Sequence, residues 1–183
     1  MSHFTKSHYL FAIITFLFFG CKKDEEVVPK NIMTYDGTEF ELSGGVVLNF
    51  GQLSSTQGNA QVLFLHSSGI KIHESGGKID STSGIGHTLY LEIFSPASTV
   101  LGDGEYNFDP YYTYQAKTFG NAYTVFNANY STSEGEFHEI MSGKVTVKKD
   151  GTDYTITFDC KEDLAGKSLT GFYKGGLKIY DEK

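Results

Sequence analysis

The part of the chain best suited to bind a ligand is a tyrosine-rich segment, residues 109–130, with the sequence DPYYTYQAKTFGNAYTVFNANY. Tyr111, Tyr112 and Tyr114 follow a proline there, so we expect them in a loop or at a strand edge. Their rings can stack on a sugar or another polar ligand. We predict that these tyrosines bind a ligand; the alternative is that they are core residues with hydroxyls at the rim. Three nearby amides would add hydrogen bonds: Asn121, Asn127 and Asn129.

Sequence patterns for catalysis are weak. The chain has no Gly-x-Ser-x-Gly nucleophile elbow, no His-Glu-x-x-His pattern and no glycine-rich phosphate loop between a strand and a helix. Two carboxylates about 5–10 Å apart can hydrolyse a glycosidic bond, but sequence spacing does not show which of them converge. We predict no catalytic residue and no cofactor, and keep a hydrolase of unknown type as a third hypothesis. The carboxylates considered are Glu92, Glu105, Asp109, Glu134, Glu136 and Glu139.

Metal ligands are also sparse. His66 and His73 would face each other if residues 67–69 formed a hairpin turn, but no third ligand accompanies them. We therefore predict no metal site. A calcium loop is not indicated either, because the acidic residues near a Gly-Asp-Gly turn lack fixed ligand spacing: Asp103, Glu105 and Asp109.

The elements that position these residues are β-strands, because apolar and polar residues alternate through most of the chain. Leu89, Leu91 and Ile93 face one way, whereas residues 62–66 carry apolar side chains of both parities and predict a strand buried on both faces. Residues 144–180 contain three alternating stretches joined by turns, which predicts a meander. Its middle strand turns one set of side chains inward: Tyr154, Ile156, Phe158 and Cys160.

These strands predict an all-β domain. With about nine to eleven strands and no convincing helical period, we expect an antiparallel two-sheet β-sandwich. The alternative is a lipocalin-like antiparallel β-barrel. Three glycines inside the last strand predict a bulge or bend, as at a barrel corner: Gly171, Gly175 and Gly176.

Composition argues against one class of partner. The 183 residues include no arginine and no tryptophan, and the formal net charge is -7 at pH 7. Binding to nucleic acid depends on cationic side chains that contact phosphates. We therefore expect no nucleic acid among the partners of this protein.

The amino terminus carries a targeting pattern. The apolar run of residues 9–19 has the length of a signal-peptide core and is too short to span a bilayer, which takes about 20 residues. Gly20 and Cys21 follow it directly. This pattern resembles a bacterial lipoprotein signal. The resemblance implies that residues 1–20 are a signal peptide that is removed, and that the Cys21 thiol carries a lipid.

The residues after this cysteine resemble the surface-export signal of Bacteroidota lipoproteins, which is a cysteine, any residue, a lysine and two acidic residues. Lys23, Asp24 and Glu25 match it. The resemblance implies a protein held in the outer membrane by its N-terminal lipid and facing the cell exterior. We expect residues 21–32 to be the lipidated cysteine and a flexible tether, and residues 33–183 to form a single β domain.

Lipidation of Cys21 would leave Cys160 as the only other cysteine, so no intrachain disulfide is expected. Cys160 lies in an alternating stretch, which indicates a buried and inert thiol.

The sequence Asp80-Ser81-Thr82 resembles the O-glycosylation acceptor of Bacteroidota proteins and implies modification of Ser81 in a Gly/Ser-rich loop. The final meander resembles the carboxy-terminal part of many small Bacteroidota lipoproteins, a resemblance that implies no activity.

Together these features predict a lipid-anchored lipoprotein with a non-enzymatic domain that binds an extracellular ligand, either a glycan or a surface protein. The alternative function is a lipocalin-like carrier that holds an apolar small molecule inside a barrel.

Overall fold

The computed structural model describes residues 29–162 and 166–183, and these residues confirm the all-β prediction. The lipoprotein signal and Cys21 lie outside the described residues. No helix with the length and apolar character of a membrane span occurs in residues 29–162 and 166–183.

The described part of the chain contains twelve strands, whereas nine to eleven were predicted. They are β1 Ile32–Tyr35, β2 Thr38–Glu41, β3 Gly44–Gln52, β4 Asn59–His66, β5 Ile70–Ser75, β6 Lys78–Ser95, β7 Gly104–Phe108, β8 Thr118–Asn129, β9 Glu134–Asp150, β10 Asp153–Glu162, β11 Ser168–Gly176 and β12 Lys178–Asp181.

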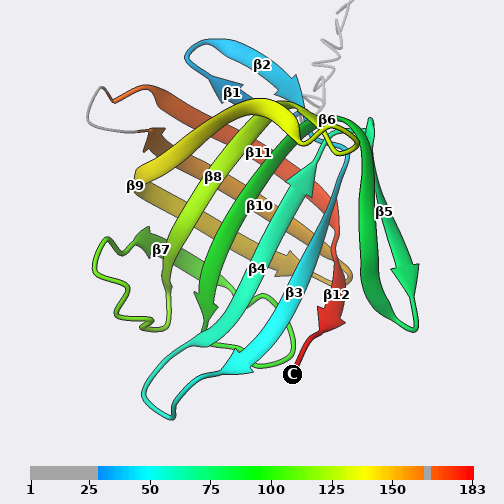
Figure 1. Cartoon of the computed structure of the whole chain (residues 1–183). Helices are drawn as coiled ribbons and strands as arrows, with labels where there is room; N and C mark the ends of the chain where they lie inside the picture. Colours follow the sequence, from blue (N-terminus) through cyan, green and yellow to red (C-terminus); the bar gives the residue numbers. More distant parts are fainter. Residues whose placement is uncertain (1–28, 163–165) are drawn as a thin grey trace, which may run out of the picture.

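The strands form a single curled sheet, a half-barrel, in the order β12-β3-β4-β6-β8-β7-β9-β10-β11-β1-β2 (Figure 1). β5 pairs only with β6 and forms a hairpin beside the sheet. The sheet is mixed, because β12 runs parallel to β3 and β7 runs parallel to β8. The predicted antiparallel sandwich of two sheets therefore needs correction to one continuous mixed sheet.

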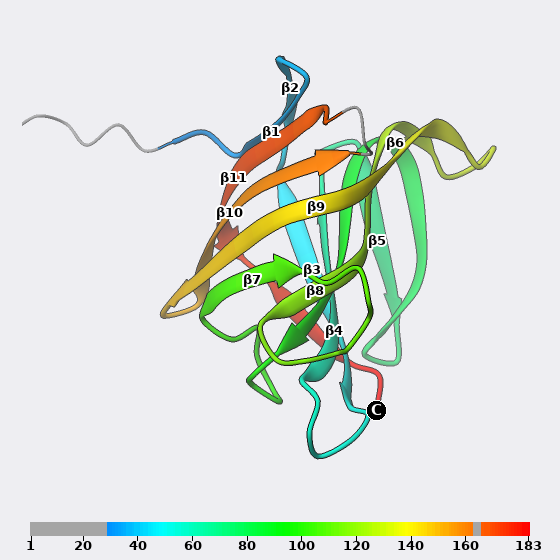
Figure 2. The ribbon, with the colours of Figure 1, turned by 90° about the vertical axis from the view of Figure 1, so that its left-hand side faces the viewer.

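The long strand β9 explains why one sheet forms instead of two. The first part of β9 pairs with β8, and its second part pairs with β10 and β7, so β9 connects both sides of the curl (Figure 2). Gly143 lies where these pairings change and has a left-handed φ of 124°. A β-carbon there would lie 2.5 Å from the Cα of Cys160, so only glycine fits.

The bend predicted at the glycines of the last strand is confirmed. β11 ends at Gly176, and after Leu177 the chain continues as β12. β11 pairs with β10 and β1, whereas β12 pairs with β3 at the other end of the strand order. One continuous segment therefore links the two sides of the curled sheet.

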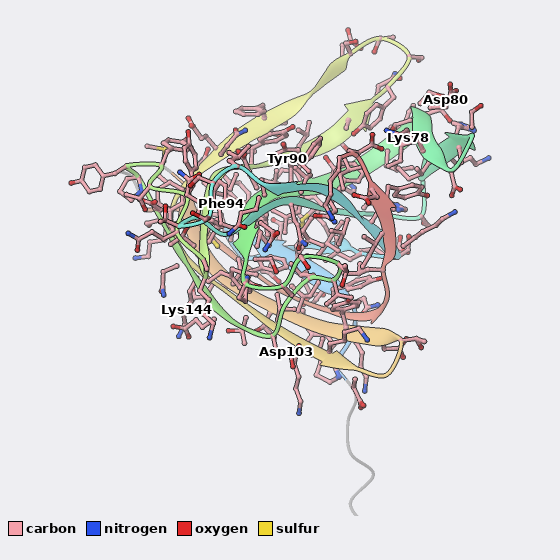
Figure 3. The ribbon with its side chains drawn as sticks, turned by 90° about the horizontal axis from the view of Figure 1, so that it is seen from below. Lys78, Asp80, Tyr90, Phe94, Asp103 and Lys144 are labelled. Carbon is pink, nitrogen blue, oxygen red and sulfur yellow. The ribbon has the colours of Figure 1, made fainter. Side chains whose placement is uncertain are left out.

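The inside of the curl is a packed core (Figure 3). Leu89, Leu91 and Ile93, which the alternation placed on one face, point into it from β6. The β9–β10–β11 meander is also present, and Cys160 is buried, which raises the pKa of its thiol to about 12. Large side chains fill the interior, including Tyr106, Phe119, Phe126, Tyr154 and Phe158.

Both ends of the curl are covered. At one end, the amide of Gln61 donates hydrogen bonds to the carbonyls of Ala97 and Val100, each 3.2 Å long, and so holds the loop of residues 96–103 across the opening. At the other end, the β1–β2 hairpin inserts Met33, and Phe40 stacks on Phe126 with ring centroids 4.1 Å apart. The core is thus enclosed by the strands, a loop and a hairpin.

Gly171 provides a test of this packing. A β-carbon at Gly171 would overlap the Phe158 ring and lie 2.7 Å from the carbonyl oxygen of Ile32. Gly171→Ala should lower the free energy of unfolding by about 1–3 kcal/mol, measured by urea denaturation. The matched control is Gly176→Ala, where a β-carbon meets nothing within 4 Å and the change should stay within about 0.5 kcal/mol. Equal effects of the two substitutions would contradict this packing.

Candidate functional site

The outward face of the sheet carries a row of apolar residues. Val46, Phe64, Tyr90 and Tyr123 are register partners across β3, β4, β6 and β8. They point away from the core because their neighbours of the other parity, such as Leu63 and Leu91, fill it. The prediction of a strand buried on both faces over residues 62–66 is confirmed in part: Val62 is buried on the outer face, whereas Phe64 and His66 there are half-buried.

Two arms flank the row. The first is the β5–β6 hairpin, which brings Ile72 and Ile79 over the outer face. The second is the turn between β8 and β9, residues 129–134. Between the arms lie two pockets of about 260 and 200 Å³, which share Phe64 and Tyr130 and which we call together the outer groove.

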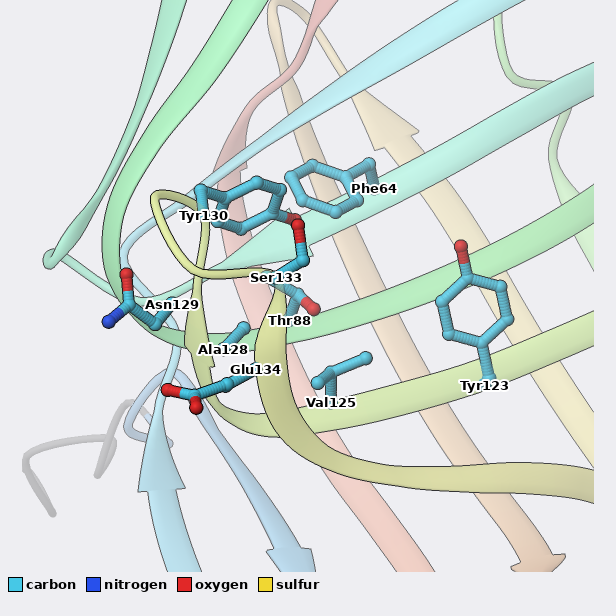
Figure 4. A pocket seen from close by; sticks show the side chains of 9 residues that line it. All are labelled: Phe64, Thr88, Tyr123, Val125, Ala128, Asn129, Tyr130, Ser133 and Glu134. Atoms are coloured by element: carbon cyan, nitrogen blue, oxygen red, sulfur yellow. The ribbon is translucent and has the colours of Figure 1, made fainter.

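The larger pocket of the outer groove mixes apolar and polar walls (Figure 4). Its lining residues are Phe64, Thr88, Tyr123, Val125, Ala128, Asn129, Tyr130, Ser133 and Glu134. The smaller pocket is more apolar, and its lining residues are Val46, Leu48, Val62, Phe64, Ile72, Ile79, Thr82, Tyr90 and Tyr130. A ligand here would meet apolar surface and a small number of hydrogen-bonding groups, which is the usual make-up of a binding site.

The tyrosines of the outer groove are ordered by stacking. The rings of Tyr90 and Tyr123 are 4.6 Å apart and nearly parallel, and Phe137 follows with its centroid 5.0 Å from that of Tyr123. Burial raises the pKa of Tyr90 to about 12 and also raises the pKa values of Tyr123 and Tyr130. Their hydroxyls therefore stay protonated at neutral pH and can both donate and accept hydrogen bonds.

The tyrosines predicted to bind a ligand lie elsewhere, in the loop between β7 and β8. Tyr111 is 86% exposed and Tyr112 is 42% exposed, whereas Tyr114 is half-buried with its ring 5.1 Å from that of Phe94. The structure thus brings Tyr111 and Tyr112 to the surface of one loop but turns Tyr114 inward. This loop lies toward the end of the molecule opposite the β1–β2 hairpin (Figure 1).

Asp109 shapes this loop. Its carboxylate accepts hydrogen bonds from the backbone N–H groups of Tyr111 and Thr113 and from the Thr113 hydroxyl, at 3.0, 2.6 and 2.6 Å. Burial acts to raise the pKa of Asp109, but these hydrogen bonds outweigh burial and lower it. The Asp109 oxygens are therefore engaged in local structure.

The other carboxylates considered from the sequence do not form one cluster. Glu105 pairs with Lys144 at 3.2 Å, and Glu136 lies 3.1 Å from a ring nitrogen of His138. Glu92 and Glu139 are on the outer face of the sheet, where they are register partners of Val62 and Tyr123. No group of three or more His, Cys, Asp or Glu suited to a metal ion occurs in residues 29–162 and 166–183.

His66 and His73 do not face each other across a hairpin. β4 pairs with β3 and β6, while β5 pairs with β6 only. The ring of His66 lies 3.0 Å from the Ser67 carbonyl, and that of His73 lies 2.6 Å from the Ser83 hydroxyl. Each histidine therefore has its own local partner.

Ser81 lies in strand β6 of the β5–β6 arm, opposite His73, and not in a loop as its Gly/Ser-rich surroundings suggested. Strand pairing with β5 supplies the hydrogen bonds that extend this segment. Ser81 is exposed, and its hydroxyl donates to the Asp80 carboxylate at 3.2 Å. Asp80 and Lys78 lie toward the outer end of this arm (Figure 3).

A buried polar network, which sequence reasoning missed, lies beneath the β1–β2 hairpin. The Tyr35 hydroxyl donates to one oxygen of Glu162, and Nδ1 of His138 lies 2.6 Å from the other oxygen. Burial acts to raise the pKa of Glu162, but the hydrogen bonds from Tyr35 and His138 lower it overall. Burial and the Glu162 carboxylate together raise the pKa of Tyr35 far above its usual value. The three residues come from β1, β9 and β10, so only the fold brings them together.

Comparison of the chain with protein-family models, with characterised proteins and with solved structures found no match.

The network predicts a pH-dependent contribution to stability. The folded pKa of Glu162 is below its ordinary value of 4.5, so its stabilising effect is complete above that pH and is lost as the pH falls through the folded pKa. Glu162→Gln should lower the free energy of unfolding by about 1–3 kcal/mol at neutral pH, with the difference from the natural protein shrinking below about pH 4. Urea denaturation over this pH range measures it. Glu105→Gln, at an exposed ion pair, is the control and should cost less than about 1 kcal/mol. A difference for Glu162→Gln that stays constant with pH would contradict the role of the carboxylate.

Proposed function

We propose that the protein is a lipid-anchored outer-membrane lipoprotein whose β domain binds an extracellular ligand, without catalysis, in the outer groove. The observation that supports this most is the row of Phe64, Tyr90 and Tyr123 on the outward face of the sheet, flanked by two arms that leave pockets between them. Apolar residues gathered on an outer surface and rimmed by polar groups are typical of binding sites.

A glycan fits the outer groove better than a flat protein surface does. The two pockets are small and separated by shared side chains, so they suit ring-sized groups joined in a chain. Thr88, Asn129, Ser133 and the tyrosine hydroxyls supply the donors and acceptors that a hydroxyl-rich ligand needs. A protein partner would instead require about 800 Å² of contact surface on each side.

The packing of the interior argues against the alternative of a lipocalin-like carrier. A carrier needs space inside the curl, but Tyr106, Phe119 and Tyr154 are buried there, and a loop and a hairpin cover its ends. The two pockets of the outer groove lie outside the core. These features support binding on the outside of the sheet.

The enzymatic alternative has one candidate group, the Tyr35–His138–Glu162 network. Its polar atoms bond to each other and, through Nε2 of His138, to Glu136, and Tyr35 and His138 are each only 9% exposed. Such a closed arrangement suits stabilisation of the β1–β2 hairpin better than contact with a substrate. This supports the proposal of a non-enzymatic domain.

Attachment through Cys21 is consistent with a free binding surface. The described chain starts at residue 29 on the side of the β1–β2 hairpin, whereas the loop after β3 and the tyrosine loop lie toward the opposite end (Figure 1). Residues 21–30, which precede Asn31 and β1, would reach at most roughly 35 Å when extended. A tether of this length would hold the domain away from the membrane surface, so a lipid on Cys21 would leave the outer groove and Ser81 accessible.

A pair of matched substitutions tests the location of the binding site. Tyr130→Ala removes the side chain shared by both pockets, and Tyr111→Ala removes an exposed ring of the tyrosine loop. We expect Tyr130→Ala to weaken retention on at least one polysaccharide in affinity gels by about tenfold, and Tyr111→Ala to leave it unchanged. The opposite result would move the site to the tyrosine loop, and retention unaffected by either change would contradict the proposal.

A second experiment tests the anchor. Cys21→Ala removes the thiol that would carry the lipid, so the protein should leave the membrane fraction and lose labelling with a fatty-acid probe. Cys160→Ala is the control, because this buried thiol should not be acylated. Continued acyl labelling of the Cys21→Ala protein would rule out lipidation at this position.

A further inference from the structure

The charged residues of this protein are unevenly distributed. Lys117 is the only lysine between Lys78 and Lys144, and it lies in the loop before β8. The same interval contains eight acidic residues: Asp80, Glu92, Asp103, Glu105, Asp109, Glu134, Glu136 and Glu139. This interval supplies most of β6, all of β8 and the first part of β9, so one half of the sheet is strongly acidic.

The outer groove lies in this acidic half. Glu134 is the only lysine, histidine, aspartate or glutamate among the lining residues of its two pockets, and Figure 4 shows it at the edge of the larger pocket. Glu92 and Glu139 stand on the same outer face, next to Tyr90 and Tyr123 respectively. The groove therefore presents negative charge around an aromatic row.

Within residues 29–162 and 166–183, salt bridges with lysines involve Glu74, Glu105, Asp181 and Glu182, and none involves Glu92, Glu134 or Glu139. Glu39 on β2 also has no salt bridge, so what distinguishes Glu134 is its place in the lining of the aromatic pocket. Glu134 is nevertheless held in position, because the Thr132 hydroxyl donates to its carboxylate at 2.9 Å. A positioned carboxylate without a cationic partner, beside an aromatic pocket, is complementary to a positively charged ligand group.

We propose that the outer groove binds an oligosaccharide that carries protonated amines, with an ammonium group placed at Glu134. This inference rests on the proposed function and names the chemical class of its ligand. The carboxylate supplies the charge at one side of the pocket, and the hydroxyls of Tyr123 and Tyr130 can accept hydrogen bonds from hydroxyls of the sugar rings. Anionic sugars would be repelled by Glu92 and Glu139.

The shape of the groove favours an amino sugar over a lysine side chain. The larger pocket has a volume of about 260 Å³ and an open, mixed polar and apolar lining, which suits a hydroxylated ring. A lysine side chain is a narrow apolar stem with a single charged end, and it would use few of the polar groups that line the pocket, such as the Ser133 hydroxyl and the Asn129 amide nitrogen. The groups that line the pocket thus match the substituents of a sugar ring.

The test compares two oligosaccharides of equal length that differ in one substituent. Oligomers of glucosamine and of N-acetylglucosamine are titrated into the folded β domain by calorimetry, at a pH at which the free amine is protonated. We expect the glucosamine oligomer to bind about tenfold more tightly, and increasing salt to weaken its binding. Glu134→Gln should remove most of the difference, since it keeps the size of the side chain and deletes the charge. The matched control is Glu39→Gln, an equal change of charge on exposed strand β2.

The outcomes separate this inference from the proposed function. If both oligomers bind equally and Tyr130→Ala weakens both, the groove is the site but the requirement for charge is wrong. If glucosamine binding is absent, or is insensitive to Glu134→Gln and Tyr130→Ala, the inference is wrong. If a lysine-rich peptide binds in a manner that depends on Glu134 and the oligomers do not, the sugar is the wrong source of the ammonium group.

Discussion

The bending of two long strands is the constraint on which the rest of this structure depends. β6 and β9 each pair with different partners along their lengths, so the sheet wraps around one interior instead of dividing in two. Alternation along these strands then places one set of side chains in the core and the other outside. The same strands extend into the two arms that flank the outer groove. Core and groove are therefore consequences of the same bend.

The two ends of the curl are stabilised in different ways. At one end, amide side chains of the interior hold a loop, with Asn49 donating to the Ser98 carbonyl and Gln61 to the carbonyls of residues 97 and 100. At the other end, a tyrosine, a histidine and a glutamate bind one another beneath a hairpin. Polar groups at the rim of an apolar core need partners, and the covering segments supply them for the Asn49 and Gln61 amide nitrogens and, through the Tyr35 hydroxyl, for the Glu162 carboxylate, whereas the Gln61 side-chain oxygen has none. An interior closed in this way leaves the outer face as the place for a ligand.

Local sequence patterns were sufficient for the strands but not for their arrangement. Alternation placed Leu89, Leu91 and Ile93 on one face of a strand and located the final meander, because parity decides which side chains share a face; that this face lies in the core is a property of the folded sheet. It missed the first half of β6, because glycine and serine have low strand propensity and only pairing with β5 extends them.

The site was harder to predict than the strands. Phe64, Tyr90 and Tyr123 belong to three separate strands, and the register that aligns them is a property of the folded sheet. The exposure of Tyr111 and Tyr112 was predictable because a proline and local turn chemistry mark a loop. The inward turn of Tyr114 was not, because it depends on contact with Phe94 from another strand.

The attachment of the first described strand has a mechanical consequence. Just before β1, the side-chain amide of Asn31 donates to the carbonyl of Lys174 at 3.0 Å, and its oxygen accepts from the Lys174 N–H at 2.7 Å. These two bonds extend the pairing of β1 with β11 by one residue toward the amino terminus. Tension applied to the chain from that side would load this pair of bonds, together with the bond from the Leu42 N–H to the Asn31 carbonyl at 3.0 Å, before the backbone bonds between β1 and β11. A single asparagine thus acts as the first point of resistance when the domain is pulled by its amino-terminal end.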